Sequence, residues 1–252
     1  MSAFRYSDTT LPIRDDIVAA NRKTWDRIAH AGCWWTAAER VAIAAETRNA
    51  RTCPLCRERK EALSPNAVQG THDGSAATGT RVLSEVAVDT VHRIVTDQSR
   101  LSREWRESLV AHGLGDGHYV ELLGVVVAVV SIDAFHSALG LPLEPLPEPV
   151  AGEPSHYRPA NAAREQAFVP MIPARGARGA EADLWQPPRT GNVVRALSLV
   201  PDAVRDLKTL SAAHYLPMDL VAVPTANGGR ALTRAQIELV AGRVSAINEC
   251  FY

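Results

Sequence analysis

The sequence predicts an all-α protein on three observations. Apolar residues recur at helical intervals in several segments, and the segment 118–139 is apolar on nearly every side. Two helix-capping boxes stand at residues 36–39 and 233–236, each a threonine followed three residues later by Glu or Gln. The 252 residues are 46% hydrophobic and 22% charged, with a mean hydropathy of -0.09, which provides for a sizeable core. This composition excludes a wholly disordered chain and a multi-span membrane protein.

Helical spacing begins near the N-terminus and continues to the first cysteine pair. One side of a first amphipathic helix is marked by Ile17, Ala20, Trp25 and Ile28. An alanine-rich second helix follows the capping box at 36–39 and is expected to end near Thr52, because Pro54 cannot continue it. Since proline suits the first turn of a helix, Cys53 and Pro54 are expected to open a short third helix that stops before Ser64.

Three further segments complete the helical pattern of the first half. After a loop over residues 64–80, apolar side chains at helical intervals are Leu83, Val86, Ala87, Val91 and Ile94. A shorter helix is expected from about Ser102 to His112. The segment 118–139 is predicted to be a central helix packed by neighbours on all sides, because about 20 residues are too many for one strand.

The composition changes sharply at Pro142. Ten of the 16 prolines lie between there and Pro188, in a stretch that lacks helical periodicity. We expect an extended connection that wraps the protein, held by its apolar side chains Phe168, Met171, Ile172 and Trp185. Helical signals return at Pro201 and again after the capping box at 233–236.

The two capping boxes belong to a longer internal similarity. Thr36 lies 17 residues before Cys53, and Thr233 lies 17 residues before Cys250. The sequence therefore predicts a nearly complete helical repeat over residues 15–140. A Pro-rich linker is expected over 141–194 and a second, partial repeat over 195–252.

The net charge indicates which partners to expect, and the apolar runs indicate where the protein is located. The net charge of -1 and a pI near 6.7 provide no basic field, so nucleic acid is not an expected partner. The N-terminus has no apolar signal core, and the longest apolar run, residues 122–130, is short for a membrane helix. We therefore expect a cytoplasmic protein with no membrane partner. Its four cysteines are too few for a disulfide scaffold.

The pair Cys53 and Cys56 is the motif that carries chemistry. A CxxC at a helix N-terminus favours the thiolate, because the unpaired N–H groups and the helix dipole stabilise a negative charge. Arg51, Arg57 and Arg59 add positive potential nearby. Such a thiol attacks peroxides or disulfides, so a redox role is the favoured interpretation.

Other interpretations of the cysteines and histidines stay open. Zinc takes four ligands, and no second CxxC or HxxxH follows at a familiar spacing, but a zinc knuckle or inert cysteines remain alternatives. Cys33 is expected to be a buried core thiol. His72 and His214 are interpreted as surface residues. His118 and His136 are interpreted as packing or capping residues, and either could serve as a base for the pair. No metal or organic cofactor is expected.

The segment 232–252 resembles the core helix of the alkylhydroperoxidase D and carboxymuconolactone decarboxylase superfamily. The usual pattern there is an acidic residue, twelve positions, CxxC, and a histidine four residues further on. The chain as a whole most resembles the two-repeat alkylhydroperoxidase-related (seleno)proteins. The resemblance implies an all-helical, homo-oligomeric protein that reduces organic hydroperoxides through its cysteine pair, with an external dithiol as reductant.

The resemblance assigns roles position by position. Glu238 matches the proton-relay carboxylate and Cys250 the first, resolving cysteine, although Glu238 could equally be a solvated helix residue. The second cysteine would be residue 253, and we expect codon 253 to be UGA, specifying selenocysteine. In the first copy both cysteines are present, but the relay position holds Val41 and the histidine position Lys60.

These observations favour thiol-dependent, or natively selenol-dependent, reduction of organic hydroperoxides in antioxidant defence. Two alternative enzymes with the same fold are a disulfide reductase and a lactone decarboxylase-like enzyme. The alternative from another class is a non-catalytic helical protein that binds a partner or is stapled by zinc. The helix that ends at Cys250 is expected to pack on the first repeat or on another subunit, because its apolar side chains need a cover.

Overall fold

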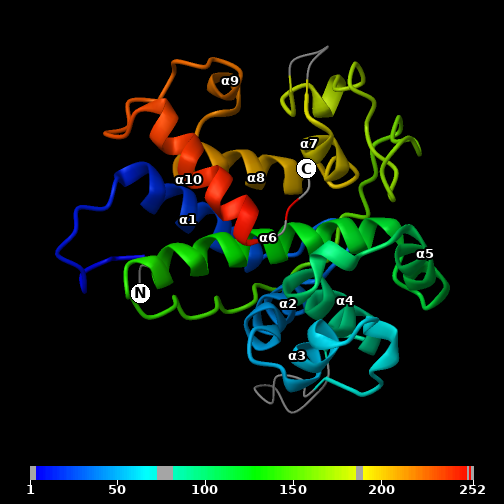
Figure 1. The fold of residues 1–252 in the computed structure, drawn as a ribbon. Coiled ribbons are helices and arrows are strands. Elements are labelled where there is room, and N and C mark those ends of the chain that lie inside the picture. The colour runs from blue at the N-terminus through cyan, green and yellow to red at the C-terminus, as the bar shows by residue number, and fades with distance from the viewer. Residues whose placement is uncertain (1–3, 73–81, 186–189, 249, 251–252) are drawn as a thin grey trace.

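The computed structural model of the protein describes residues 4–72, 82–185, 190–248 and 250. Within these residues there are ten α-helices and no strand, and the prediction of an all-α fold is confirmed. An isolated β-bridge joins Ala163 and Met171. Figure 1 shows α6 crossing the middle of the molecule, with α2, α3 and α4 on one side and α8 on the other.

Eight of the ten helices lie where the sequence predicts a helix. The ten are α1 (Asp15–Ile28), α2 (Ala37–Ala50), α3 (Pro54–Glu61), α4 (Glu85–Thr96), α5 (Arg103–Ala111), α6 (Asp116–Ala138), α7 (Asn192–Ala196), α8 (Pro201–His214), α9 (Met218–Val221) and α10 (Arg234–Ile247). The sequence does not predict α7 and α9, because helices of five and four residues are too short to show a period. The expected loop 64–80 contains a short 3₁₀ helix, η1 (Pro65–Ala67), and its residues 73–80 lie outside the described part.

Both predicted capping boxes form. The Thr36 hydroxyl accepts a hydrogen bond from the Glu39 backbone N–H, and the Glu39 carboxylate accepts one from the Thr36 N–H at 2.8 Å. Thr233 and Gln236 make the same reciprocal pair at the start of α10. Each box satisfies backbone donors that have no partner within the helix, so these starts follow from local sequence.

The core lies around α6, which packs against α1, α2, α4 and α8. By length and composition α6 is the one helix of the described residues that could cross a membrane. In the most apolar 18-residue stretch of α6, 56% is buried inside the protein, and Leu122, Val129 and Ile132 are fully enclosed. In this structure α6 is therefore the core helix that the sequence predicts.

Two arginines of α2 neutralise acidic side chains buried on α6. Arg40 pairs with Glu121, which also accepts a hydrogen bond from the Trp34 N–H at 2.7 Å. Arg48 binds Asp133 through two hydrogen bonds of 2.8 and 2.9 Å. Both carboxylates are almost fully buried, so these pairs fix how α2 lies along α6.

The Pro-rich segment is extended and wraps the helices, as expected. Backbone N–H groups of residues 150, 155 and 156 donate to carbonyl groups of residues 29, 32 and 33, between α1 and α2. Met171, Ile172 and Trp185 are buried, as the sequence predicts. Phe168 differs: it is 38% exposed and lies under the Arg103 guanidinium, 5.1 Å from it.

The helices that follow the Pro-rich segment share a core with the helices of the first half. α8 packs against both α1 and α6, so it is part of one helical assembly with them. α10 is covered much less: Ile237 is buried, whereas Val240, Val244 and Ile247 are more than half exposed. The predicted cover over the α10 face is therefore absent from the described part of this chain.

Candidate functional site

The CxxC pair lies at the N-terminus of α3, as the sequence predicts. Cys53 is the N-cap residue, Pro54 is the first helical residue, and Cys56 lies in the first turn. Both cysteines are free thiols and both are buried, at 8% and 4% exposure. A cysteine pair that attacks peroxides is expected to have at least one thiol open to solvent, and this expectation is wrong here. Their neighbours are polar, however, because two histidines cover them.

His72 and His92 come from different elements and turn the same ring atom toward the sulfurs. His72 follows η1, and its Nδ1 lies 3.4 Å from Cys53 Sγ and 3.8 Å from Cys56 Sγ. His92 lies on α4, and its Nδ1 is 3.2 Å from Cys56 Sγ. Ligand atoms of these four buried residues all lie within 4.8 Å of one another. We call them the Cys–His cluster.

A carboxylate lies behind each imidazole. Glu46 of α2 lies 3.1 Å from His92 Nε2, and Asp89 of α4 lies 2.9 Å from His72 Nε2. Arg59 of α3 pairs with Asp89. When each Nε2–H donates to its carboxylate, Nδ1 faces the sulfurs. A charged imidazolium then donates a proton from Nδ1 to sulfur, whereas a neutral ring presents a lone pair there.

Contacts within the cluster lower the pKa of the Cys56 thiol and raise the pKa of both histidines. Burial raises the pKa of the Cys56 thiol, but hydrogen bonds with His72 and His92 outweigh it and lower that pKa to about 6. Burial lowers the pKa of His92, but hydrogen bonds with Cys56 and Glu46 raise it to about 9. For His72, the contacts with Asp89 and both sulfurs raise the pKa to about 10 against the same burial effect. The arrangement therefore favours a thiolate beside imidazolium groups.

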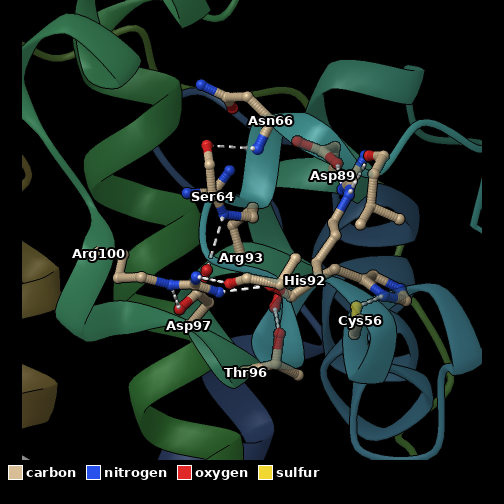
Figure 2. A network of polar contacts seen from close by, with 12 residues as sticks. Cys56, Ser64, Asn66, Asp89, His92, Arg93, Thr96, Asp97 and Arg100 are labelled. Atoms are coloured by element: carbon tan, nitrogen blue, oxygen red, sulfur yellow. Dashed lines mark hydrogen bonds and ion pairs between the residues drawn. The ribbon is translucent and has the colours of Figure 1, made fainter.

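α4 is tied to α3 just beyond the cluster. Arg100 donates hydrogen bonds to the carbonyl groups of Arg59 and Ala62 at the end of α3, and it pairs with Asp97 at 2.7 Å. Figure 2 shows this network on one side of His92 and Cys56 on the other. These contacts tie the end of α3 to the end of α4, close to the cluster.

A cavity of about 580 Å³ lies beside the cluster. His72, Asp89 and Arg59 line it, whereas neither cysteine does. Its apolar lining comes from Val68, Val86, Val88, Trp105 and Leu109. The cavity thus reaches the rear of the His72 imidazole, and His72 stands between it and the sulfurs.

The site residues expected in the second repeat do not join the cluster. Glu238 is exposed on α10, where it accepts hydrogen bonds from the Tyr215 hydroxyl at 2.5 Å and the Arg234 guanidinium at 2.6 Å. Cys250 is exposed beyond the end of the helix. Twelve residues of helix span roughly 18 Å, so Glu238 cannot serve Cys250 along a straight α10.

The histidines also differ from expectation. Neither His118 nor His136 reaches the pair: His118 packs against Trp34 and Trp35, and His136 binds the Pro142 carbonyl. These two packing roles are as predicted, and the alternative that one is the base of the pair is not supported.

His72 corrects a second expectation. It is 7% exposed and is not a surface residue, because the sulfurs and Asp89 enclose its ring. His214 is also not fully at the surface, since it is half-buried and hydrogen-bonded to Asn21 at 2.8 Å. Cys33 is buried as predicted, at 7% exposure.

Sequence reasoning missed Glu46, Asp89 and His92. No signal from spacing existed for His92, because it directly follows Val91 and so points about 100° away from the apolar stripe that predicts α4. The family pattern instead places the relay groups at Val41 and Lys60, which hold no such side chains. In this structure the His92 imidazole reaches Cys56, with the Glu46 carboxylate behind it, and the pattern includes neither position.

The chain matches no known protein-family description, no curated protein and no solved structure. The superfamily resemblance therefore stays a prediction carried by the motif alone.

Proposed function

We propose that the Cys53–Cys56 pair reduces organic hydroperoxides, with an external dithiol as the reductant. The observation that carries this proposal is the array of Cys56, His92 and Glu46, in which the sulfur lies 3.2 Å from one ring nitrogen and the carboxylate 3.1 Å from the other. A nucleophile, a base and a group that orients the base are the parts that an activated thiol requires.

Cys56 is the attacking residue in this mechanism. Its thiolate sulfur forms a bond to the terminal oxygen of the hydroperoxide while the O–O bond breaks, so sulfur is oxidised to a sulfenic acid and an alkoxide leaves. The thiolate of Cys53 then attacks that sulfur, a disulfide forms, and hydroxide leaves as water after taking a proton. The two electrons that reduce the peroxide come from the two thiols. A dithiol restores them.

His92 supplies the proton that the departing alkoxide needs, because its Nδ1 lies beside Cys56 Sγ. As an imidazolium it donates from Nδ1 toward the sulfur and can pass that proton to the departing alkoxide. Glu46 holds the other ring nitrogen and favours the charged ring. His72 can provide the second proton, because its Nδ1 lies near both sulfurs.

The cavity beside His72 supports an organic rather than a purely inorganic substrate. Val86, Val88, Trp105 and Leu109 give it an apolar wall, and about 580 Å³ is within the usual size of small-ligand sites. Reaching the sulfur from there requires the His72 ring to move aside.

The test measures consumption of cumene hydroperoxide by chelator-treated protein with dithiothreitol as reductant. Cys56→Ser is expected to abolish consumption, and Cys53→Ser to stop turnover while a sulfenic acid accumulates that dimedone traps. Cys33→Ala is the matched control, because that thiol is buried outside the cluster, and its rate is expected to equal that of the unaltered protein. Equal rates for Cys56→Ser and the unaltered protein would contradict the proposal.

A further inference from the structure

We propose that Cys53, Cys56, His72 and His92 also form a tetrahedral site for a zinc ion. The four side chains converge from three places, the start of α3, the chain after η1, and α4. Zinc in structural sites takes four sulfur and nitrogen ligands, and Cys₂His₂ is one of the common sets. This site stands on the geometry of the cluster and does not depend on the proposed peroxidase activity.

The distances between the side chains match those of a coordination sphere. With Zn–S near 2.3 Å and Zn–N near 2.0 Å, sulfur and nitrogen at two corners of a tetrahedron lie about 3.5 Å apart. Three of the four sulfur–nitrogen distances in the cluster are 3.2, 3.4 and 3.8 Å, and all ligand atoms lie within 4.8 Å of one another. An ion can therefore occupy the centre once the ligand atoms move slightly toward it.

The surroundings of the two histidines also fit zinc ligands. A metal-bound histidine usually donates its other N–H to a carboxylate, which fixes the ring orientation and its tautomer. Glu46 holds His92 Nε2 in this way, and Asp89 holds His72 Nε2. Each ring is thereby set to present Nδ1 to the ion.

Charge and softness select the ion. Two thiolates and two neutral imidazoles balance the charge of Zn²⁺, and Arg59 offsets the carboxylate of Asp89. Thiolate ligands are too soft for Mg²⁺ or Ca²⁺, which prefer oxygen. All four positions are filled by buried side chains, which is typical of a structural zinc site rather than a hydrolytic one with an open position.

Zinc and peroxide would compete for the same two sulfurs. A thiolate bound to zinc is not free to attack, whereas oxidation of both thiolates to a disulfide, with two electrons passing to the peroxide, removes two ligands and releases the ion. Bound zinc is therefore expected to suppress peroxide consumption, and peroxide to release zinc. This regulatory consequence alone rests on the proposed function.

The first experiment measures metal in the whole chain purified without chelator, by plasma mass spectrometry. It then titrates the chelator-treated chain with Zn²⁺ against a chromophoric chelator. We expect about one zinc per chain, and Co²⁺ in its place should give the visible bands of a tetrahedral site with a near-ultraviolet thiolate band. Failure of both the purified and the titrated chain to hold zinc would overturn the site.

Matched variants identify the ligands. His72→Ala and Cys53→Ser should each weaken zinc binding strongly, and Asp89→Asn should weaken it 10- to 100-fold as loss of an outer partner does. His112→Ala is the control, because His112 lines the same cavity but lies outside the cluster. Equal affinity of His72→Ala and His112→Ala would overturn the four-ligand assignment. Circular dichroism checks that each variant is folded.

The two proposals fail in different ways. Zinc bound by the unaltered chain, together with no peroxide consumption by the metal-free chain, leaves the zinc site standing and ends the peroxidase proposal. Peroxide consumption by a chain that binds no zinc leaves the peroxidase proposal standing and ends the zinc site. If both activities are present but zinc leaves the peroxide rate unchanged, the two do not share the Cys–His cluster, and the zinc assignment is wrong.

Discussion

Cys56 is the residue at which the two proposals meet, because two imidazoles lie within 4 Å of its sulfur. In the metal-free protein its pKa of about 6 and that of His92, about 9, define the pH range in which thiolate and imidazolium coexist. Below about pH 6 the sulfur takes up a proton, and above about pH 9 the ring loses its own. The ion pair is therefore complete near neutral pH.

The first prediction concerns the pH dependence of Cys56 alkylation in metal-free protein. The iodoacetamide rate at Cys56, followed by peptide mass spectrometry, should rise with a midpoint near pH 6, well below the ordinary thiol pKa of about 8.5. Glu46→Gln should move this midpoint upward, because it weakens the imidazolium that stabilises the thiolate. Cys250, exposed on the same chain, is the internal reference. A midpoint at Cys56 equal to that at Cys250 would count against the ion pair.

The sequence predicts the sulfurs of the site but not the imidazoles. Cys53 and Cys56 form a local motif whose helix N-terminus follows from Pro54, so spacing is sufficient. His92 lies 36 residues beyond Cys56, and only the packing of α4 against α2 brings it back. His72 lies in a loop segment without periodicity, where nothing local distinguishes a buried histidine from a solvated one.

At the scale of elements, the site is where α2, the start of α3, and α4 meet. Asp89 and His92 lie three residues apart on α4 and so share a face. Glu46 belongs to the buried face of α2, together with Ile43 and Thr47. α2 therefore has two tasks: toward α4 it carries the carboxylate behind His92, and toward α6 it carries the arginines that neutralise buried acids.

The helices themselves were more accessible to sequence reasoning than the contacts between them. Capping threonines, Pro54 and the apolar stripes are local signals, and the observed starts of α2, α3 and α10 follow them. The buried acidic residues of α6 show the limit of that reasoning. Glu121 and Asp133 interrupt an apolar segment, and their partners Arg40 and Arg48 are identified by the packing alone.

The second prediction tests the contact between α2 and α6. Arg48→Ala leaves the Asp133 carboxylate, 1% exposed, without its bidentate partner, and should lower the free energy of unfolding by about 3–5 kcal/mol. Replacing both together, as Arg48→Met with Asp133→Leu, should recover much of the loss because no charge stays buried alone. Urea denaturation measures both.

The matched control for that experiment is Arg243→Ala on exposed α10. Its free energy of unfolding is expected to stay within about 0.5 kcal/mol of the unaltered protein. An Arg48→Ala loss no larger than this control would show that the pair does not hold α2 on α6.

At the scale of the whole molecule, the Pro-rich segment and α8 both pack on the helices of the first half. The segment bonds to the turn between α1 and α2, and α8 packs on α1 and α6. The sequence predicts such a wrapping segment from its composition and its apolar side chains. It could not predict the route, because a chain without periodicity carries no information on which surface it crosses.

The last prediction concerns assembly. Val240, Val244 and Ile247 recur at intervals of four and three residues, so they form one stripe of α10, and they are 58%, 52% and 64% exposed. An apolar stripe of this kind is stabilised by a partner surface, and the resemblance to an oligomeric superfamily leads us to expect a second copy of the chain there. Light scattering over a range of concentrations should therefore show self-association. Val244→Glu should shift the protein toward monomer, whereas Ser245→Glu adds the same charge beside the stripe and should not. A monomer at every concentration, or equal effects of the two substitutions, would show that this stripe is not where copies of the chain meet.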